Sequence, residues 1–420
     1  MRNWAGNLTF GAARVERPKS VDELAGIVAA ADRVHAAGSR HCFNDIADTP
    51  GVMISTEHLR RIDDVNHSGT SSTVTIDSGV TYGQLGPTLY EQGYALPNLA
   101  SLPHITVAGA TATATHGSGE SLGCLSTSVA GIEFVLADGG IRRVRRGDAD
   151  FDGVVVHLGG LGVVGRLTLD VVPTFEIEQT VIEGVPMDAF AANLDDIVGS
   201  VYSISGFTNW KPPRFHQVWL KALAGQTPFD LTQVGGTPAT RPLHPIEGLG
   251  LASDGAEADA CTRQLGVAGP WHERLTHFRN EFTPSSGDEL QSEYFVPREH
   301  AAAAMRAVAP LGEEIAAVVQ ASEIRFIAAD ELWMSMFYRR PSVAFHFTWR
   351  NDWPAVRALL PKIESALAPF GPRPHWGKLF TMPKEQVLAV TPNAERFRAL
   401  RDEMDPSGKF RNAYIERHLF

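Results

Sequence analysis

Two pairs of polar residues alternate with apolar residues in the second half of this 420-residue chain. Glu323 and Arg325 stand in "ASEIRFIA", and His346 and Thr348 stand in "VAFHFTWR". Because residues two apart on a strand point to the same face, each segment predicts one packed face and one face of ionisable and hydroxyl groups. Such groups suit a polyhydroxylated ligand, which needs both donors and acceptors. A solvent-exposed sheet would give the same alternation, and the residues alone leave that alternative open.

A further cation, Lys378, stands among aromatic residues in "RPHWGKLF". Lysines are found mostly on exposed surfaces, so an aromatic segment is a less expected place for one. We therefore add Lys378 to the residues that could bind or act on a polar ligand.

Three stretches of the first half combine small residues with the expected ends of strands. They are "VHAAGSRHCFND" at 34–45, "LPNLASLPHITVAGATATATHGSG" at 96–119, and Gly160, Gly162 and Gly165. Small residues allow the backbone to approach a bound group closely, and successive backbone N–H groups can hold a diphosphate. Each stretch alone could be an ordinary turn, but three in one region favour a binding site.

The glycines at 160–165 match G-x-G-x-x-G. A dinucleotide fold of the Rossmann type requires a helix to start at these glycines, whereas an alternating, β-branched segment follows here. The sequence therefore predicts a tight connection between strands and no Rossmann domain.

Composition excludes several classes of protein. The net charge of −11 argues against a broad basic surface for nucleic acid or anionic membrane. No H-E-x-x-H or C-x-x-C motif occurs, which leaves open only a metal centre assembled from distant residues. The three cysteines lie far apart in the sequence, which predicts no disulfide framework. The sequence shows no signal peptide and no apolar run of ~20 residues, so we expect a cytoplasmic protein.

The elements that must position these residues are mixed in type. "RPKSVDELAGIVAAADR" predicts a helix within 17–33, with Ser20 as N-cap and Glu23 completing a capping box. A short strand at 34–37 then leads into the glycine turn at Gly38. This order of helices and strands predicts an α+β or α/β fold.

The remainder of the chain supports more than one domain. Residues 129–172 are rich in strands, with a hairpin turn at 138–140. The pattern of residues changes at 173–180, which is a candidate domain boundary. Further on, "SEYFVPREHAAAAMRAVAPL" predicts a strand followed by a helix. The length favours two or three domains.

Taken in order and spacing, eight segments resemble the alditol oxidases. These are flavoproteins of the vanillyl-alcohol oxidase type, close to xylitol and sorbitol oxidases and more distantly related to sugar-lactone oxidases. The resemblance runs from Asn3 to about Tyr414. The segments are "GSRHCFND", "LPNLASLPHITVAGATATATHGSG", "GLGVVGRLTLDV", "SEYFVPRE", "SEIR", "AFHFTW", "RPHWGKLF" and "DPSGKFRNAY".

The resemblance implies an α+β, two-domain fold. A PCMH-type FAD-binding domain would occupy residues 1–172, and a mixed-sheet substrate or cap domain would occupy residues 173–379. Residues 380–420 would form a C-terminal segment that returns to the FAD domain.

The resemblance also assigns a covalent flavin. In that family the histidine of the glycine loop is joined to the FAD, and His41 stands at the matching position; Arg40 replaces the usual glycine and Cys42 the usual serine. Some relatives add a second bond through a cysteine near Ser101, where none occurs here, so one bond is implied. The residues expected to contact FAD are His41, Gly38, Ser39, Arg40, Cys42, Phe43, Asn44, Ser101, His104, Val107, Ala108, Gly109, Thr113, Thr115, His116, Gly117, Gly162, Val163, Val164, Lys378 and Asn412.

The polar pairs would then hold a polyol. Arg325 and Lys378 are the expected catalytic cations, because an alcohol oxygen becomes partly anionic as a hydride leaves its carbon for flavin N5. His346 is expected to be catalytic as a proton acceptor. The remaining substrate-binding residues would be Ser101, Glu323 and Thr348.

The implied activity is an FAD-dependent oxidase. It would convert the terminal primary alcohol of xylitol, sorbitol or glycerol to the aldehyde and reduce O2 to hydrogen peroxide. A sugar-1,4-lactone oxidase or dehydrogenase on the same fold is the nearest alternative, and a flavin-free carbohydrate-binding protein is a more distant one. The expected partners are the polyol and O2, with no nucleic acid or membrane, and the chain is expected to be a monomer.

Overall fold

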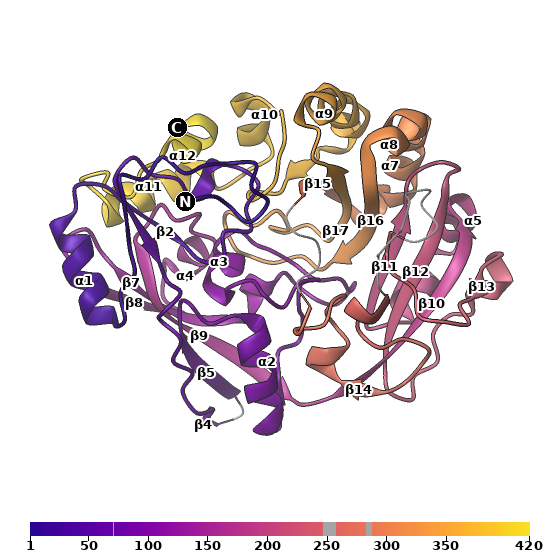
Figure 1. Cartoon of the computed structure of the whole chain (residues 1–420), viewed down its shortest axis with the longest axis horizontal. Helices are drawn as coiled ribbons and strands as arrows, with labels where there is room; N and C mark the ends of the chain where they lie inside the picture. The colour runs from indigo at the N-terminus through magenta and orange to yellow at the C-terminus, as the bar shows by residue number, and fades with distance from the viewer. Residues whose placement is uncertain (70, 247–257, 283–287) are drawn as a thin grey trace.

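The computed structural model describes residues 1–69, 71–246, 258–282 and 288–420. Within these residues the strands form three sheets, and most helices lie on the outer faces of the sheets (Figure 1). No helix of the described residues is long and apolar enough to cross a membrane.

Two sheets build the N-terminal part, drawn in indigo and purple in Figure 1. A parallel sheet has the strand order β1-β3-β2, and an antiparallel sheet has the order β4-β5-β9-β7-β8, with β6 paired to β9. Their bounds are β1 (Arg14–Glu16), β2 (Val34–Ala37), β3 (Val52–Ser55), β4 (Asn66–Ser68), β5 (Ser71–Asp77), β6 (Tyr94–Ala95), β7 (Val129–Val135), β8 (Ile141–Arg145) and β9 (Val163–Pro173).

Several expectations for this part are confirmed. The strand expected at 34–37 is β2, and a hairpin turn at 138–140 joins β7 to β8. The glycines at 160–165 run into β9 and not into a helix, which confirms that this is no Rossmann domain. The N-terminal helix begins after Ser20, but the carboxylate of Glu23 accepts from the backbone N–H of Lys19, so the expected capping box is displaced by one residue.

The second half of the chain folds around a nine-stranded sheet. Its order is β13-β10-β12-β11-β16-β17-β15-β18, with β14 paired to β10. The strands are β10 (Glu176–Pro186), β11 (Ser203–Thr208), β12 (Arg214–Leu223), β13 (Thr237–Pro238), β14 (Gly269–Pro270), β15 (Glu289–Pro297), β16 (Val319–Ile327), β17 (Ser342–Arg350) and β18 (Arg373–Pro374).

The register of this sheet sets which side chains share a face. Glu293 on β15 and Glu323 on β16 both lie directly opposite His346 on β17. Cross-strand partners point to the same face, and a slip of one residue would reverse every side chain. One face therefore carries these ionisable groups in a row, while Ile324 and Phe345, which belong to the alternate set, lie in the hydrophobic core.

Helices cover the apolar face of the large sheet and flank the N-terminal sheets (Figure 1). Apolar side chains of α9, among them Leu360 and Ile363, are fully buried in the core. The helices are α1 (Val21–Ala30), α2 (Tyr82–Glu91), α3 (Val107–Ala112), α4 (Phe151–Val154), α5 (Met187–Ala192), α6 (Leu194–Gly199), α7 (Ala301–Val308), α8 (Gly312–Val318), α9 (Trp353–Leu367), α10 (Lys384–Ala389), α11 (Ala394–Met404) and α12 (Ala413–Leu419).

The last residues of the chain lie against the N-terminal part, as the yellow helices beside β2 and α4 show in Figure 1. The Lys409 ammonium donates to the carbonyl oxygens of Val28 (2.8 Å) and Ala137 (2.6 Å). The Asn412 amide donates to the carbonyl oxygen of Ile46 (2.8 Å). These bonds fix the returning segment to the N-terminal part of the chain.

Candidate active site

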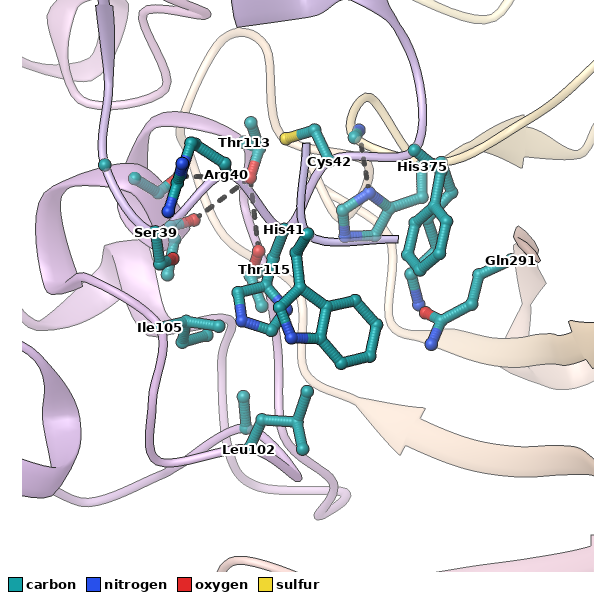
Figure 2. A pocket seen from close by; sticks show the side chains of 18 of the residues that line it. Ser39, Arg40, His41, Cys42, Leu102, Ile105, Thr113, Thr115, Gln291 and His375 are labelled. Carbon is teal, nitrogen blue, oxygen red and sulfur yellow. Dashed lines mark hydrogen bonds between the residues drawn. The ribbon is translucent and has the colours of Figure 1, made fainter. Parts of the chain in front are cut away.

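A cavity of about 710 Å³ lies between the N-terminal part and the polar face of the large sheet. Its size is in the range of cofactor and ligand sites. On one side it is lined by the loop after β2 and by residues around α3, and on the other by β15, β16 and β17. Figure 2 shows side chains of the loop, from Ser39 to Cys42, with Gln291 and His375 from the second half of the chain.

The loop after β2 is held close to α3. A Cβ atom on Gly38 would lie 2.1 Å from the Thr106 hydroxyl oxygen, so only glycine fits there. The Thr106 backbone N–H donates to the Ser39 hydroxyl at 3.2 Å. Arg40 has a φ of 62°, a conformation that glycine adopts freely and that costs another residue about 1–2 kcal/mol. The arginine therefore keeps the backbone path of the glycine that it replaces.

His41 projects from this loop into the cavity. Burial, together with the smaller effects of the nearby His104 and Arg40, lowers the pKa of the His41 imidazole to about 4. The ring is therefore neutral at physiological pH, with one nitrogen lone pair free to react.

Lys378 belongs to a buried cluster around Glu293. Its ammonium lies 2.7 Å from a carboxylate oxygen of Glu293 and 2.8 Å from Nδ1 of His346. His116 Nε2 lies 3.2 Å from the other oxygen of Glu293, which is completely buried. Nδ1 of His346 accepts from Lys378, so its Nε2 carries the proton and donates to the Thr348 hydroxyl at 3.0 Å.

Arg325 belongs to a second cluster, around Glu323. Its guanidinium lies 2.6 Å from one oxygen of Glu323, and His277 Nε2 lies 2.8 Å from the other. Behind His277, the buried Lys221 ammonium donates to the carbonyl oxygens of Leu275 and Thr276 and lies 3.3 Å from His277 Nδ1. Lys221 thus directs Nδ1 of His277 to accept and Nε2 to donate to Glu323.

Burial and ion pairing shift the pKa values of these groups in opposite directions. Burial alone would raise the pKa of Glu293, but Lys378, His116 and His346 hold it well below its usual value. Glu323 follows the same rule, because Arg325 and His277 outweigh its burial and lower its pKa. Burial lowers the pKa of Lys378, although Glu293 opposes that effect.

His346 and His277, one in each cluster, are neutral. Burial lowers the pKa of His346 to about 4 and that of His277 to about 4. The polar face of the sheet therefore presents ionised carboxylates, cations and neutral imidazoles in a largely buried space. In such a low-dielectric space, fixed charges act more strongly than in water.

Buried polar atoms that lack a partner among the described residues line the same cavity. They include the hydroxyl oxygens of Ser78, Ser101 and Thr106, Nε2 of His35 and Nε of Arg325. Buried polar groups are almost always hydrogen-bonded, so these atoms indicate a polar ligand that the protein is built to hold. A cavity lined by both apolar side chains and such polar atoms fits a cofactor with a flat ring system and a polar tail.

Most residues expected to contact FAD line this cavity, as do all six residues expected to hold or act on the polyol. The polyol set is Ser101, Glu323, Arg325, His346, Thr348 and Lys378. The expected FAD contacts found in the lining are Gly38, Ser39, Arg40, His41, Cys42, Phe43, Ser101, Ala108, Gly109, Thr113, Thr115, His116, Gly162, Val164 and Lys378.

Six expected contacts lie outside the lining. Val107 and Val163 are core residues, and the backbone at Gly117 packs on Asn98. His104 is hydrogen-bonded to the carbonyl oxygen of Asn280. Asn44 and Asn412 bind backbone groups near the cavity. Asn44 donates to the carbonyl oxygens of Trp376 and Lys378, and Asn412 caps α12.

The sequence analysis missed several residues of the site. Glu289, Gln291 and Glu293 alternate along β15 and line the cavity, and the period-two pattern that singled out β16 and β17 would have found them. His277 and His375 lie in segments without a repeating pattern, so no periodic signal marks them.

Two family models match parts of the chain. One, described as "FAD binding domain", matches residues 12–145, and one described as "D-arabinono-1,4-lactone oxidase" matches residues 288–418. An alditol oxidase from a Streptomyces species is 45% identical over 98% of this chain and 97% of its own length. The chain belongs to the alditol oxidase family.

Other relatives agree with this family, which is of the vanillyl-alcohol oxidase type. An L-gulono-1,4-lactone dehydrogenase from Mycobacterium tuberculosis is 29% identical over 99% of this chain and 98% of its own. Among solved structures, a cholesterol oxidase from B. sterolicum matches with a TM-score of 0.77 at 15% identity, covering 100% of this chain and 96% of its own. The fold is thus the α+β, two-domain, PCMH-type FAD-binding fold that the sequence predicts.

No group of three or more metal-ligating side chains of a kind that could hold a metal ion occurs in the described part of the chain. The acidic residues of the cavity are instead paired with cations and histidines. This pairing lowers the pKa of Glu293, so the stability of the fold should depend on pH in acid.

We expect the melting temperature of Glu293→Gln to fall less with decreasing pH than that of the wild type. A carboxylate whose pKa is lower in the folded than in the unfolded state stabilises the fold above the unfolded pKa, and that stabilisation is lost as the pH falls through the folded pKa. Melting temperatures from about pH 6 to about pH 3 should therefore fall less steeply for Glu293→Gln than for the wild type. Glu299→Gln, which changes an exposed carboxylate, is the control and should follow the wild type. Parallel curves for all three proteins would contradict the pairing.

Proposed function

We propose that this protein is an FAD-dependent oxidase that converts the terminal primary alcohol of an alditol to the aldehyde and reduces O2 to hydrogen peroxide. The observation that carries the proposal is a pair of cations, the buried Arg325 and the largely buried Lys378, each held by a carboxylate on a polar sheet face that shares a cavity with His41. Xylitol, sorbitol and glycerol are the candidate substrates. The 45% identity to an alditol oxidase supports this substrate class.

FAD would be held by the loop after β2, by residues around α3 and by the connection at Gly162 and Val164. When bound, it accepts a hydride from carbon and passes the two electrons to O2. We propose one covalent bond to it, through His41, whose neutral ring supports that role. Ser101, with its unpartnered hydroxyl, lies on the same lining and would contact both cofactor and substrate.

The residues of the sheet would bind and orient the polyol. Arg325 and Lys378 would stabilise the oxygen of the reacting alcohol as it gains negative charge, because Glu323 and Glu293 hold both cations on this sheet face before the reaction. His346 would take the hydroxyl proton at Nδ1 once the Lys378 ammonium turns from that nitrogen to the substrate oxygen. Thr348 accepts a hydrogen bond from His346, so its own hydroxyl hydrogen remains to donate to the substrate.

Glu323 would have a second role besides the substrate binding expected from the sequence. It is held by both Arg325 and His277, so its carboxylate would position Arg325 as well as accept a hydrogen bond from a polyol hydroxyl. Its replacement would therefore disturb both binding and rate.

A lactone-oxidising activity is the second candidate, since a family model for a lactone oxidase matches residues 288–418 and a lactone dehydrogenase is 29% identical to the chain. Turnover of xylitol and sorbitol against L-gulono-1,4-lactone distinguishes the two. Activity confined to the lactone would overturn the proposal.

We further propose that residues 1–172 and 380–420 hold the cofactor and that residues 173–379 hold the substrate. The bonds from Lys409 and Asn412 to the N-terminal sheets support this division. Cys42 and Cys124 are free thiols in the structure, which supports a cytoplasmic setting. We propose a monomer with the polyol and O2 as its partners.

We expect His41→Ala to lose acid-stable flavin. Denaturation with acid releases a flavin that is bound only by contacts, whereas a covalent flavin stays with the precipitated chain. The precipitate of the wild type should be yellow and that of His41→Ala colourless. His104→Ala is the matched control, because this neighbouring histidine lies outside the cavity lining, and its precipitate should stay yellow. A yellow precipitate from His41→Ala would place the bond elsewhere.

We expect Lys378→Met and Arg325→Met to lower the limiting rate of flavin reduction by about two to three orders of magnitude, as removal of one charge-stabilising donor does elsewhere. The effect on polyol affinity should be smaller, because the bound alcohol oxygen is neutral. Anaerobic stopped-flow reduction over a range of xylitol concentrations separates the two effects.

Two variants control this experiment. Thr348→Ala should weaken binding at least as much as it slows reduction, since a distant hydroxyl changes little in charge. The double variant Glu293→Gln/Lys378→Met removes both charges of the pair, so it restores neutrality to the buried site without restoring the rate. Near-normal limiting rates in both single cation variants would show that the cations only bind substrate.

A further inference from the structure

The residues at the start of the chain form a closed turn that touches the loop carrying His41. Backbone bonds join Asn3 to Leu8 and Phe10 to Met1, so residues 1–10 fold back on themselves. Three of the hydrogen bonds that leave this turn reach the loop. The Trp4 backbone N–H donates to the carbonyl oxygen of Arg40 at 2.8 Å.

Side chains of the turn extend this contact. The Asn3 amide donates to the carbonyl oxygen of Cys42 at 2.9 Å, and the Asn7 amide donates to that of Phe43 at 2.9 Å. The carbonyl groups on both sides of His41 are thereby fixed. The left-handed conformation of Arg40, which is unfavourable for a residue other than glycine, is held in place by the same bonds.

The indole of Trp4 lies flat on the imidazole of His41. Their ring centroids are 4.6 Å apart and the planes differ by 23°. Among the described residues, no group is hydrogen-bonded to the His41 ring, so the stacked indole is the contact that orients it. Both rings line the cavity.

We propose that Trp4 is a positioning residue for the attachment of the flavin: its indole fixes the plane of the His41 ring so that one ring nitrogen faces the flavin's benzenoid-edge methyl group. This proposal rests on the covalent bond at His41 proposed above. Trp4 acts through His41 and has no part in alcohol oxidation.

The bond forms between an imidazole nitrogen and the methyl carbon. The nitrogen supplies the electron pair of the new bond, and two protons leave, one from the methyl group and one from the imidazole. The two electrons that remain on the cofactor pass to O2, which takes up two protons and becomes hydrogen peroxide. The histidine must therefore be neutral and aimed at the methyl carbon when it reacts.

The stacked indole orients the His41 ring and does not set its protonation state. A ring face attracts cations, so an indole on the imidazole would favour its protonated form. Burial nevertheless keeps the pKa of His41 at about 4, so the ring is neutral in the folded protein. Loss of the indole should consequently slow attachment through lost orientation, an effect that reaches about two orders of magnitude for a misplaced reacting group.

The experiment measures the acid-stable share of the flavin in protein purified at successive times after induction. In Trp4→Leu, an apolar side chain replaces the ring, and we expect the share to rise about 10- to 100-fold more slowly than in the wild type while total flavin per chain is retained. In Trp4→Phe a ring can stack again, and attachment should recover to within about threefold of the wild type. Trp353→Ala, which removes a partly exposed tryptophan at the start of α9, is the matched control and should not change the share.

Three results would overturn the proposal. They are wild-type attachment in Trp4→Leu, equally slow attachment in Trp4→Leu and Trp4→Phe, and loss of all bound flavin from both variants, which would make the turn necessary for cofactor binding or folding. Absence of acid-stable flavin from the wild type is a separate result, which would remove the covalent bond at His41 itself.

Discussion

The ion pair between Lys378 and Glu293 is the interaction on which the site depends. Glu293 is completely buried, and a buried charge without a partner costs several kcal/mol, so neither group could remain ionised there alone. The register of β15, β17 and β16 brings a carboxylate to each side of His346 and leaves a cation beside each carboxylate. The same sheet face thus provides both the charges and the means of keeping them charged.

This pairing determines the charge that a substrate encounters in the cavity. At rest, the charges of each pair cancel, so a neutral polyol enters without displacing a free ion. As an alcohol oxygen gains negative charge, the cations are already in place in a largely buried site, where their attraction is strong. Arginine stays charged at any physiological pH, whereas burial lowers the pKa of Lys378, so Lys378 is the cation whose charge depends on Glu293.

Local patterns in the sequence predict much of this site, and long-range register explains what they miss. Alternation marks Glu323, Arg325, His346 and Thr348, and small residues mark the loop at Gly38. In β15 the sequence predicts a strand but does not single out Glu293 as a site residue. His277 could not be found in this way, because it comes from an irregular segment and meets Glu323 only through tertiary folding. The stack of Trp4 on His41 likewise joins residues that no local pattern connects.

The most direct test of this account is the pH dependence of flavin reduction by xylitol in Glu293→Gln. Because Glu293 raises the pKa of Lys378, its neutralisation should lower that pKa, and the cation should be lost at a lower pH. The alkaline decline of the limiting reduction rate should then move down by about 1–3 pH units relative to the wild type, the usual effect of one close charge. An alkaline decline at the same pH in both proteins would contradict the claim that Glu293 maintains the catalytic cation.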